Sequence, residues 1–128
     1  MRPIQRIRVL LVEDHAELAD ATEEFLETMG LDVRLAEDGK SALEVAEAFR
    51  PQIVLCDLRL SDISGLEVAR ALRSNPHTRD IVFALYSALA ESDLRALQSD
   101  YSDHIDCFLS KPLTEKMLKK LLGELKRK

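Results

Sequence analysis

The sequence has little of what several classes of protein require. Its two cysteines, Cys56 and Cys107, lack the paired spacing of a zinc site or a redox motif, and His15, His77 and His104 are not spaced to share a metal. The four glycines form no phosphate-cradling loop. No apolar run approaches the roughly 20 residues that span a bilayer, and the N-terminus lacks the order of a secretory signal. We therefore expect a cytoplasmic chain that does not enter a membrane, with both cysteines reduced and buried.

The chain also lacks an excess of positive charge, since its 18 Lys and Arg residues are outnumbered by 23 Asp and Glu residues. The formal net charge of −5 argues against direct binding of nucleic acid, because such a surface needs a basic stripe to neutralise phosphates. The basic residues that cluster lie at the two ends of the chain, and we interpret them as solvated helix face and tail: Arg2, Arg6, Arg8, Lys116, Lys119, Lys120, Lys126, Arg127 and Lys128. Length and an apolar content of 46% are ordinary for one globular domain, which we expect to cover residues 1–128.

Short apolar runs that end in polar residues recur along the chain. Three of them, Ile7–Val12, Ile53–Cys56 and Ile81–Tyr86, are typical of strands buried on both faces of a sheet. At 32–35 apolar and polar residues alternate, which predicts an edge strand. A fifth strand is expected at Asp106–Ser110.

Segments with helical periodicity separate these strands. In the first of them the apolar residues recur at helical spacing: Leu18, Ala21, Phe25, Leu26 and Met29. Gly30 stands where a left-handed residue ends a helix. The other helices are expected at Gly39–Arg50, Gly65–Ser74, Glu91–Tyr101 and Thr114–Lys126. Five strands that alternate with five helices predict an α/β fold, a doubly wound parallel sheet with helices on both faces.

Polar side chains follow four of the expected strands. Glu13 and Asp14 come after the first, Asp57 ends the third, Ser87 follows the fourth, and Lys111 follows the fifth. Ligands of such sheets bind beyond the carboxyl ends of the strands, so these groups are expected to meet at one rim. Taken alone, the first two acids would be interpreted as helix-capping residues. Their combination with the other groups favours a functional site.

Three carboxylates at one small site need a cation. Two unit charges about 4 Å apart repel by roughly 4 kcal/mol at an effective dielectric constant of about 20. Carboxylate oxygens suit Mg²⁺ better than zinc, which prefers His and Cys. With the ion and Lys111 present the local charge is balanced, and both could stabilise a phosphoryl group on one carboxylate. The residues therefore suit an acyl phosphate.

Four short motifs contain these residues. In chain order they are Val12-Glu13-Asp14, Asp57 with Gly65 eight positions later, Ser87-Ala88, and Phe108-Leu109-Ser110-Lys111-Pro112. In this order and spacing they resemble the motif set of bacterial response-regulator receiver domains, over nearly the whole chain. The resemblance implies strand order 2-1-3-4-5 and a flavodoxin-like three-layer sandwich.

The resemblance also assigns roles to individual positions. Asp57 would be the phosphoacceptor and, with Asp14, a direct ligand of Mg²⁺, whereas Glu13 would bind the ion through water. The backbone carbonyl of Arg59 would complete the protein ligands, and Lys111 would bind the phosphoryl oxygens.

A conformational switch is implied in the same way. Ser87 would hydrogen-bond to the phosphoryl group and shift inward, and Phe108 would repack toward the space it leaves. The Lys111–Pro112 bond is expected to be cis. The implied donor is a phosphohistidine on a histidine kinase or histidine phosphotransfer domain of a two-component phosphorelay. The receiver could stand alone or be joined to a kinase or output domain outside this chain.

The sequence departs from the family pattern at two positions. Ser61 replaces the usual proline and His104 the usual glycine, so the resemblance does not settle the shape of these two turns. Arg59 is long and charged beside the expected phosphoryl site, where it either changes the lifetime of the modification or remains solvated.

Two other functions compete with the signalling receiver. A pseudo-receiver would keep the fold for protein docking alone, which the intact set of polar residues disfavours. A metal-dependent phosphatase that works through an aspartyl phosphate normally has a second aspartate one residue after the first, and Asp57-Leu58-Arg59 lacks it. We therefore expect a signalling module that catalyses only its own phosphorylation and dephosphorylation.

Overall fold

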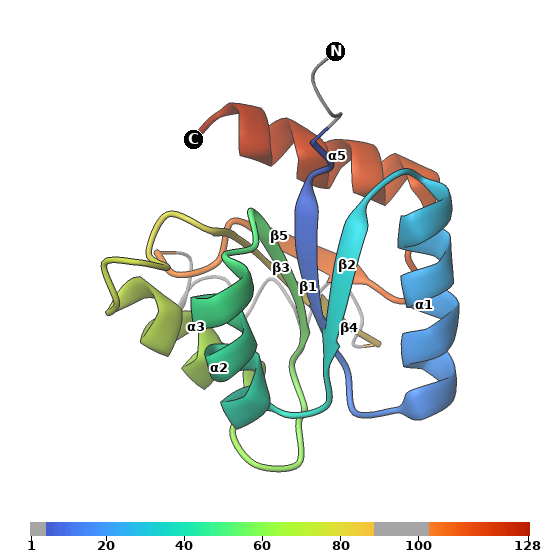
Figure 1. Ribbon diagram of the computed structural model, residues 1–128. Helices are drawn as coiled ribbons and strands as arrows, with labels where there is room; N and C mark the ends of the chain where they lie inside the picture. Colours follow the sequence, from blue (N-terminus) through green and yellow to red (C-terminus); the bar gives the residue numbers. More distant parts are fainter. Residues whose placement is uncertain (1–4, 89–102) are drawn as a thin grey trace.

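The computed structural model describes residues 5–88 and 103–128, and strands and helices alternate through the first of these two ranges (Figure 1). In chain order they are β1 Arg8–Val12, α1 Ala16–Thr28, β2 Asp32–Ala36, α2 Gly39–Phe49, β3 Ile53–Asp57, α3 Gly65–Arg73, β4 Val82–Ser87, β5 Cys107–Ser110 and α5 Glu115–Lys126. The helix expected at Glu91–Tyr101 lies outside the described residues. The other expected elements are present, with ends that move by one or two residues.

The five strands form one parallel sheet in the order β2-β1-β3-β4-β5. Helices α1 and α5 cover one face and α2 and α3 the other (Figure 1), because right-handed crossovers place each helix against the sheet. The predicted α/β fold and its strand order are therefore confirmed. The strand order reverses between β1 and β3, so the carboxyl ends of these two strands flank the position where such sheets bind ligands.

Alternate side chains of the central strands fill two separate cores. Every residue of β3 is buried. Leu10, Val54 and Phe83 pack toward α2 and α3, whereas Leu11 and Leu55 pack toward α1 and α5. Burial on both faces explains why these strands are continuous apolar runs. Strand β2 lies at the edge, as its alternating pattern predicts.

Helix ends follow local signals, with one correction to the expected face of α1. Met29 is 40% exposed at the helix end, and Ala21 is exposed too, because the buried face of α1 runs through Thr22 instead. Gly30 has φ +89°, the left-handed conformation expected after the helix. His15 is exposed, and its ring nitrogen Nδ1 accepts a hydrogen bond from the Leu18 N–H at 3.3 Å. This histidine therefore caps α1.

An ion pair joins α3 to β4 and β5 at the amino ends of these strands. Arg73 donates to the carboxylate of Asp106 at 2.8 Å and to the carbonyls of Ile81 at 2.6 Å and His104 at 3.1 Å. The same carboxylate oxygen accepts the backbone N–H of Phe83 at 2.8 Å. One guanidinium thus connects three elements, which sequence periodicity did not indicate.

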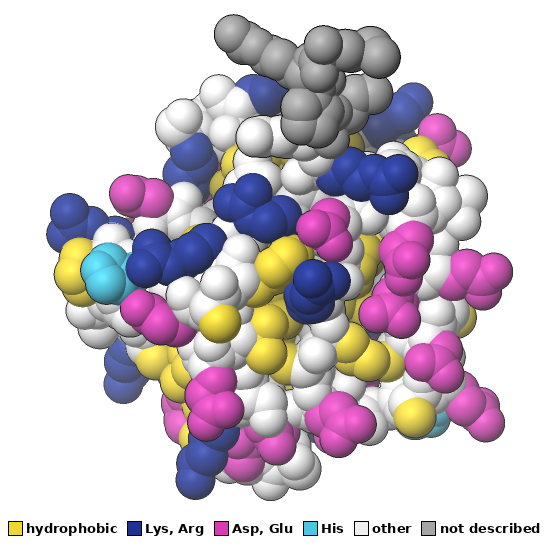
Figure 2. Space-filling model, in the orientation of Figure 1, with side chains coloured by type: hydrophobic (Ala, Val, Ile, Leu, Met, Phe, Trp, Pro, Cys, Tyr) yellow, Lys and Arg dark blue, Asp and Glu magenta, His cyan; other side chains and the backbone are white. Residues whose placement is uncertain are grey.

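Charge is unevenly distributed over the face drawn in Figure 2. Acidic side chains gather over α1, and Lys and Arg side chains lie toward α5. The acidic residues of α1 are Glu17, Asp20, Glu23, Glu24 and Glu27. Among the helices that the structure describes, none is long and apolar enough to span a bilayer.

Candidate functional site

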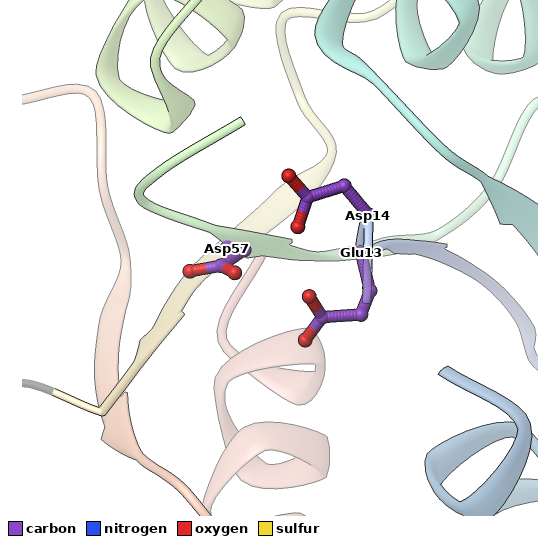
Figure 3. A group of neighbouring side chains, drawn as sticks. All are labelled: Glu13, Asp14 and Asp57. Atoms are coloured by element: carbon purple, nitrogen blue, oxygen red, sulfur yellow. The ribbon is translucent and has the colours of Figure 1, made fainter. Parts of the chain in front are cut away.

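Three carboxylates converge at the carboxyl ends of β1 and β3. Glu13, Asp14 and Asp57 each offer an oxygen, and these oxygens lie within 4.8 Å of one another (Figure 3). Glu13 and Asp57 are buried, whereas Asp14 is exposed. Three negative charges so close together repel one another unless cations neutralise them.

Lys111 supplies one of the neutralising charges. Its Nζ donates to Oε1 of Glu13 at 2.6 Å and to Oδ2 of Asp57 at 3.0 Å. Burial alone would lower the pKa of this lysine, but its hydrogen bonds and charge attraction to the two carboxylates outweigh that effect and raise the pKa. The side chain therefore remains an ammonium. The Lys111–Pro112 bond is cis.

The three carboxylates differ in their hydrogen-bond and ion-pair partners. The second oxygen of Glu13, Oε2, accepts the His15 N–H at 3.2 Å, so both of its oxygens are engaged. Among the described residues, no hydrogen bond or ion pair engages the carboxylate of Asp14. Because one ammonium offsets only one of three negative charges, the remaining oxygen ligands fit a hard divalent cation such as Mg²⁺.

A pocket of about 250 Å³ opens beside Asp57. Among the described residues, it is also lined by Arg59, Ser87, Ala88 and Lys111. Ser87 is buried, and its backbone carbonyl accepts the Lys111 N–H at 2.9 Å. Arg59 is exposed, and its backbone N–H lies 3.4 Å from Oδ1 of Asp57. The predicted phosphoacceptor thus shares one cavity with two cationic side chains and a hydroxyl group.

Phe108 is not among the described residues that line this cavity. It pairs in register with Leu85 of β4 and packs, half-buried, against the core on the side of α2 and α3. Its neighbours in the core are consistent with an ordinary packing role. Its role as a switch stays a prediction.

Asp62 is a residue of the site's surroundings that sequence reasoning missed. Its two oxygens accept the N–H groups of Gly39 and Lys40, each at 2.8 Å. Burial opposes the charged form of Asp62, but these backbone hydrogen bonds lower its pKa to about 2. The acid therefore ties the loop after β3, where Ser61 departs from the family pattern, to the first turn of α2.

Gly65 lies against the backbone of β3 at Asp57. Its N–H donates to the carbonyl of Leu58 at 2.8 Å. A Cβ at this position would lie 2.3 Å from the carbonyl oxygen of Asp57 and 3.0 Å from the Leu85 side chain. Since the first of these atoms belongs to the backbone, only glycine allows this approach.

The substitution Gly65→Ala is expected to lower the free energy of unfolding by about 2–3 kcal/mol, since the loop after β3 must move away from Asp57. Urea unfolding followed by circular dichroism measures this. The matched control is Gly123→Ala in α5, where a Cβ meets nothing within 4 Å. We expect that control to be neutral or stabilising by up to about 1 kcal/mol. Equal effects of the two substitutions would contradict the steric argument.

The comparisons with known proteins agree with this geometry. A model of the response regulator receiver domain family matches residues 9–123. The response regulator ArlR of Staphylococcus saprophyticus is 33% identical over 121 residues, which cover 94% of this chain and 53% of ArlR. The probable methanogenesis regulatory protein FilR2 of Methanothrix harundinacea is 33% identical over 127 residues, which cover 92% of this chain and 80% of FilR2. The chain spans about half the length of several curated relatives it matches, for example 49% of RpaA of Synechocystis.

A solved structure extends the comparison to the site. The receiver domain of sensor histidine kinase PA1611 from Pseudomonas aeruginosa, crystallised with a magnesium ion coordinated in its active-site cleft, is 26% identical. It superposes with a TM-score of 0.83, and the match covers 95% of this chain and 99% of that domain. The chain therefore belongs to the response regulator receiver domains of two-component signalling, which are signalling modules and not conventional enzymes.

Proposed function

We propose that Asp57 accepts a phosphoryl group and that residues 1–128 form one receiver domain. The observation that carries this proposal is the position of the Asp57 carboxylate, in a pocket with Lys111 and within 4.8 Å of two other carboxylates. A carboxylate oxygen attacks phosphorus, and the bond from phosphorus to the leaving group of the donor breaks. Lys111 neutralises the phosphoryl oxygens, and the hydroxyl of Ser87 hydrogen-bonds to them.

Mg²⁺ fits the ligands of this site. Asp14 and Asp57 would bind it directly, Glu13 through water, and Arg59 through its backbone carbonyl. The deeper burial of Glu13, whose side chain is 1% exposed against 13% for Asp57, supports its indirect role. When bound, the ion supplies charge neutralisation for the carboxylates and the incoming phosphoryl group.

The donor that we propose is a phosphohistidine of a histidine kinase or histidine phosphotransfer domain in the cytoplasm. Phosphorylation would then shift the balance between two arrangements of Ser87 and Phe108. Family membership supports this partner class, and the neighbouring strands of the two residues support their coupling, because β4 and β5 pair in register.

Intact mass spectrometry after incubation with acetyl phosphate and Mg²⁺ tests the proposal. We expect one phosphoryl group per chain, with acetate released, and no adduct when EDTA removes the metal. Absence of an adduct with Mg²⁺ present would leave a docking module as the function. Continuous turnover of a small phosphate ester would instead indicate a phosphatase.

Asp14→Asn is expected to weaken Mg²⁺ binding at least about tenfold, because it removes one unit charge from the ligand set. Asp14 is exposed, so the substitution is not expected to disturb the core. Calorimetric titration with Mg²⁺ measures the affinity. Asp80→Asn is the matched control, since Asp80 is also exposed and lies near the amino end of β4, away from the site. Unchanged affinity in the Asp14 variant would remove this residue from the proposed ligands.

A further inference from the structure

Tyr86 lies directly beneath the charged site. It is 1% exposed and pairs in register with Asp57 on β3 and with Leu109 on β5. Since Lys111 follows Leu109 by two residues, its side chain falls on the same face of the sheet as the tyrosine. The Lys111 Nζ lies 5.1 Å from the centroid of the Tyr86 ring. This distance is within the range in which an aromatic face attracts a cation.

The contact of Tyr86 with Lys111 is made by the ring and not by the hydroxyl group. It is buried and has no hydrogen-bond partner among the residues that the structure describes. An unsatisfied buried hydroxyl is unfavourable, so within the described structure the part of the side chain that makes a favourable polar contact is the ring. Tyr86→Phe would remove the hydroxyl and keep that contact.

Among the described residues, three groups hold the ammonium of Lys111 in place: the carboxylates of Glu13 and Asp57 and the ring of Tyr86. A lysine side chain is a flexible stem that carries a point charge, so its position depends on such contacts. Both carboxylates belong to the proposed metal and phosphoryl site and would share their charge with new ligands there. The attraction of the ring does not depend on those ligands.

We propose that Tyr86 is a positioning residue for Lys111, whose ring keeps the ammonium directed at the phosphoryl pocket while Glu13 and Asp57 engage other groups. This inference rests on the proposed function. On this proposal the rate of phosphoryl transfer depends on an aromatic ring that is not itself a ligand of the metal or of the phosphoryl group.

Nuclear magnetic resonance tests the contact without any phosphorylation. The ε-methylene protons of Lys111 are expected to be shifted upfield by the ring current of Tyr86. The shift should persist in Tyr86→Phe and disappear in Tyr86→Met, which fills the core without a ring. An ordinary lysine shift in the unmodified protein would overturn the proposal even if labelling by acetyl phosphate occurs.

The rate of labelling at saturating Mg²⁺ tests the consequence. Tyr86→Met is expected to slow labelling roughly tenfold, which corresponds to about 1.4 kcal/mol, whereas Tyr86→Phe should stay within about twofold. Phe83→Met is the matched control for lost packing, because Phe83 is also 1% exposed on β4 but faces the other core. It should label at the normal rate.

Each other outcome contradicts the inference. A normal rate in Tyr86→Met would show that the ring is dispensable, and an equal loss in Tyr86→Phe would assign the effect to the hydroxyl. An equal loss in Phe83→Met would assign it to core packing. Failure of the unmodified protein to label would contradict the proposed function instead, and the proton shift would still report on the contact between Tyr86 and Lys111.

Discussion

Asp57→Asn is expected to abolish phosphoryl labelling by acetyl phosphate in the presence of Mg²⁺. Asparagine has nearly the same shape as aspartate, but its neutral amide is not a nucleophile for phosphorus. The neighbouring Glu13 does not offer a substitute, because its side chain is 1% exposed, whereas that of Asp57 is 13% exposed and lines the pocket. Intact mass spectrometry measures the adduct, and peptide mapping of the unsubstituted protein locates it.

An Asp-to-Asn substitution away from the site is the control for Asp57→Asn, because it removes the same charge. Asp80→Asn is expected to label as fully as the unsubstituted protein, because this exposed acid lies next to the amino end of β4. A full adduct on the Asp57 variant would place the phosphoacceptor on another residue. Labelling lost in both variants would point to a general effect of the removed charge.

Arg73→Met is expected to lower the free energy of unfolding by about 3 kcal/mol. The guanidinium donates to the carboxylate of Asp106 and to the carbonyls of His104, Arg79 and Ile81. Its side chain is 14% exposed and that of Asp106 is 20% exposed, so water replaces the lost donors poorly. Removing the guanidinium leaves the largely buried Asp106 carboxylate with the more exposed ammonium of Lys128, 3.4 Å from Oδ1, as its ion-pair partner among the described residues. Breaking a largely buried pair in this way costs more than the pair itself contributes. Urea unfolding measures the change.

Two further variants of α3 separate this network from a general effect of charge. Arg70→Met removes an exposed arginine of the same helix and should change stability by less than about 0.5 kcal/mol. Arg73→Lys should recover only part of the loss, because a point charge cannot reach the four acceptors that the planar guanidinium serves. An Arg73→Met variant as stable as Arg70→Met would refute the proposed role of the network.

The sequence predicted the strands and helices that can be recognised from the order of apolar and polar residues within a short stretch of chain. The apolar runs that became β1, β3 and β4 reflect burial on both faces of the sheet, and the alternation in β2 reflects its edge position. The exceptions lie in α1, where Ala21 and Met29 continue the helical spacing but are exposed. Periodicity shows which face a residue shares, but it does not show where the neighbouring core ends.

The strand order came from resemblance to a family, since alternation of strands and helices alone is compatible with several orders. The rim of polar groups came from chemistry, because carboxyl ends of parallel strands meet at one edge. The distances within that rim required the structure. Lys111 and Glu13 are 98 positions apart in the chain, and only the fold shows that their side chains meet at 2.6 Å.

The sequence by itself thus determined the class of fold, the type of each described element and the candidate residues of the site, since these follow from local periodicity and from the chemistry of strand ends. Tertiary structure alone decided the partners of side chains that look ordinary in sequence. In the sequence, Tyr86 is one more residue of a buried strand, Asp62 is a loop acid, and Arg73 is a helix arginine. Their contacts depend on how distant elements pack, which no short-range pattern records.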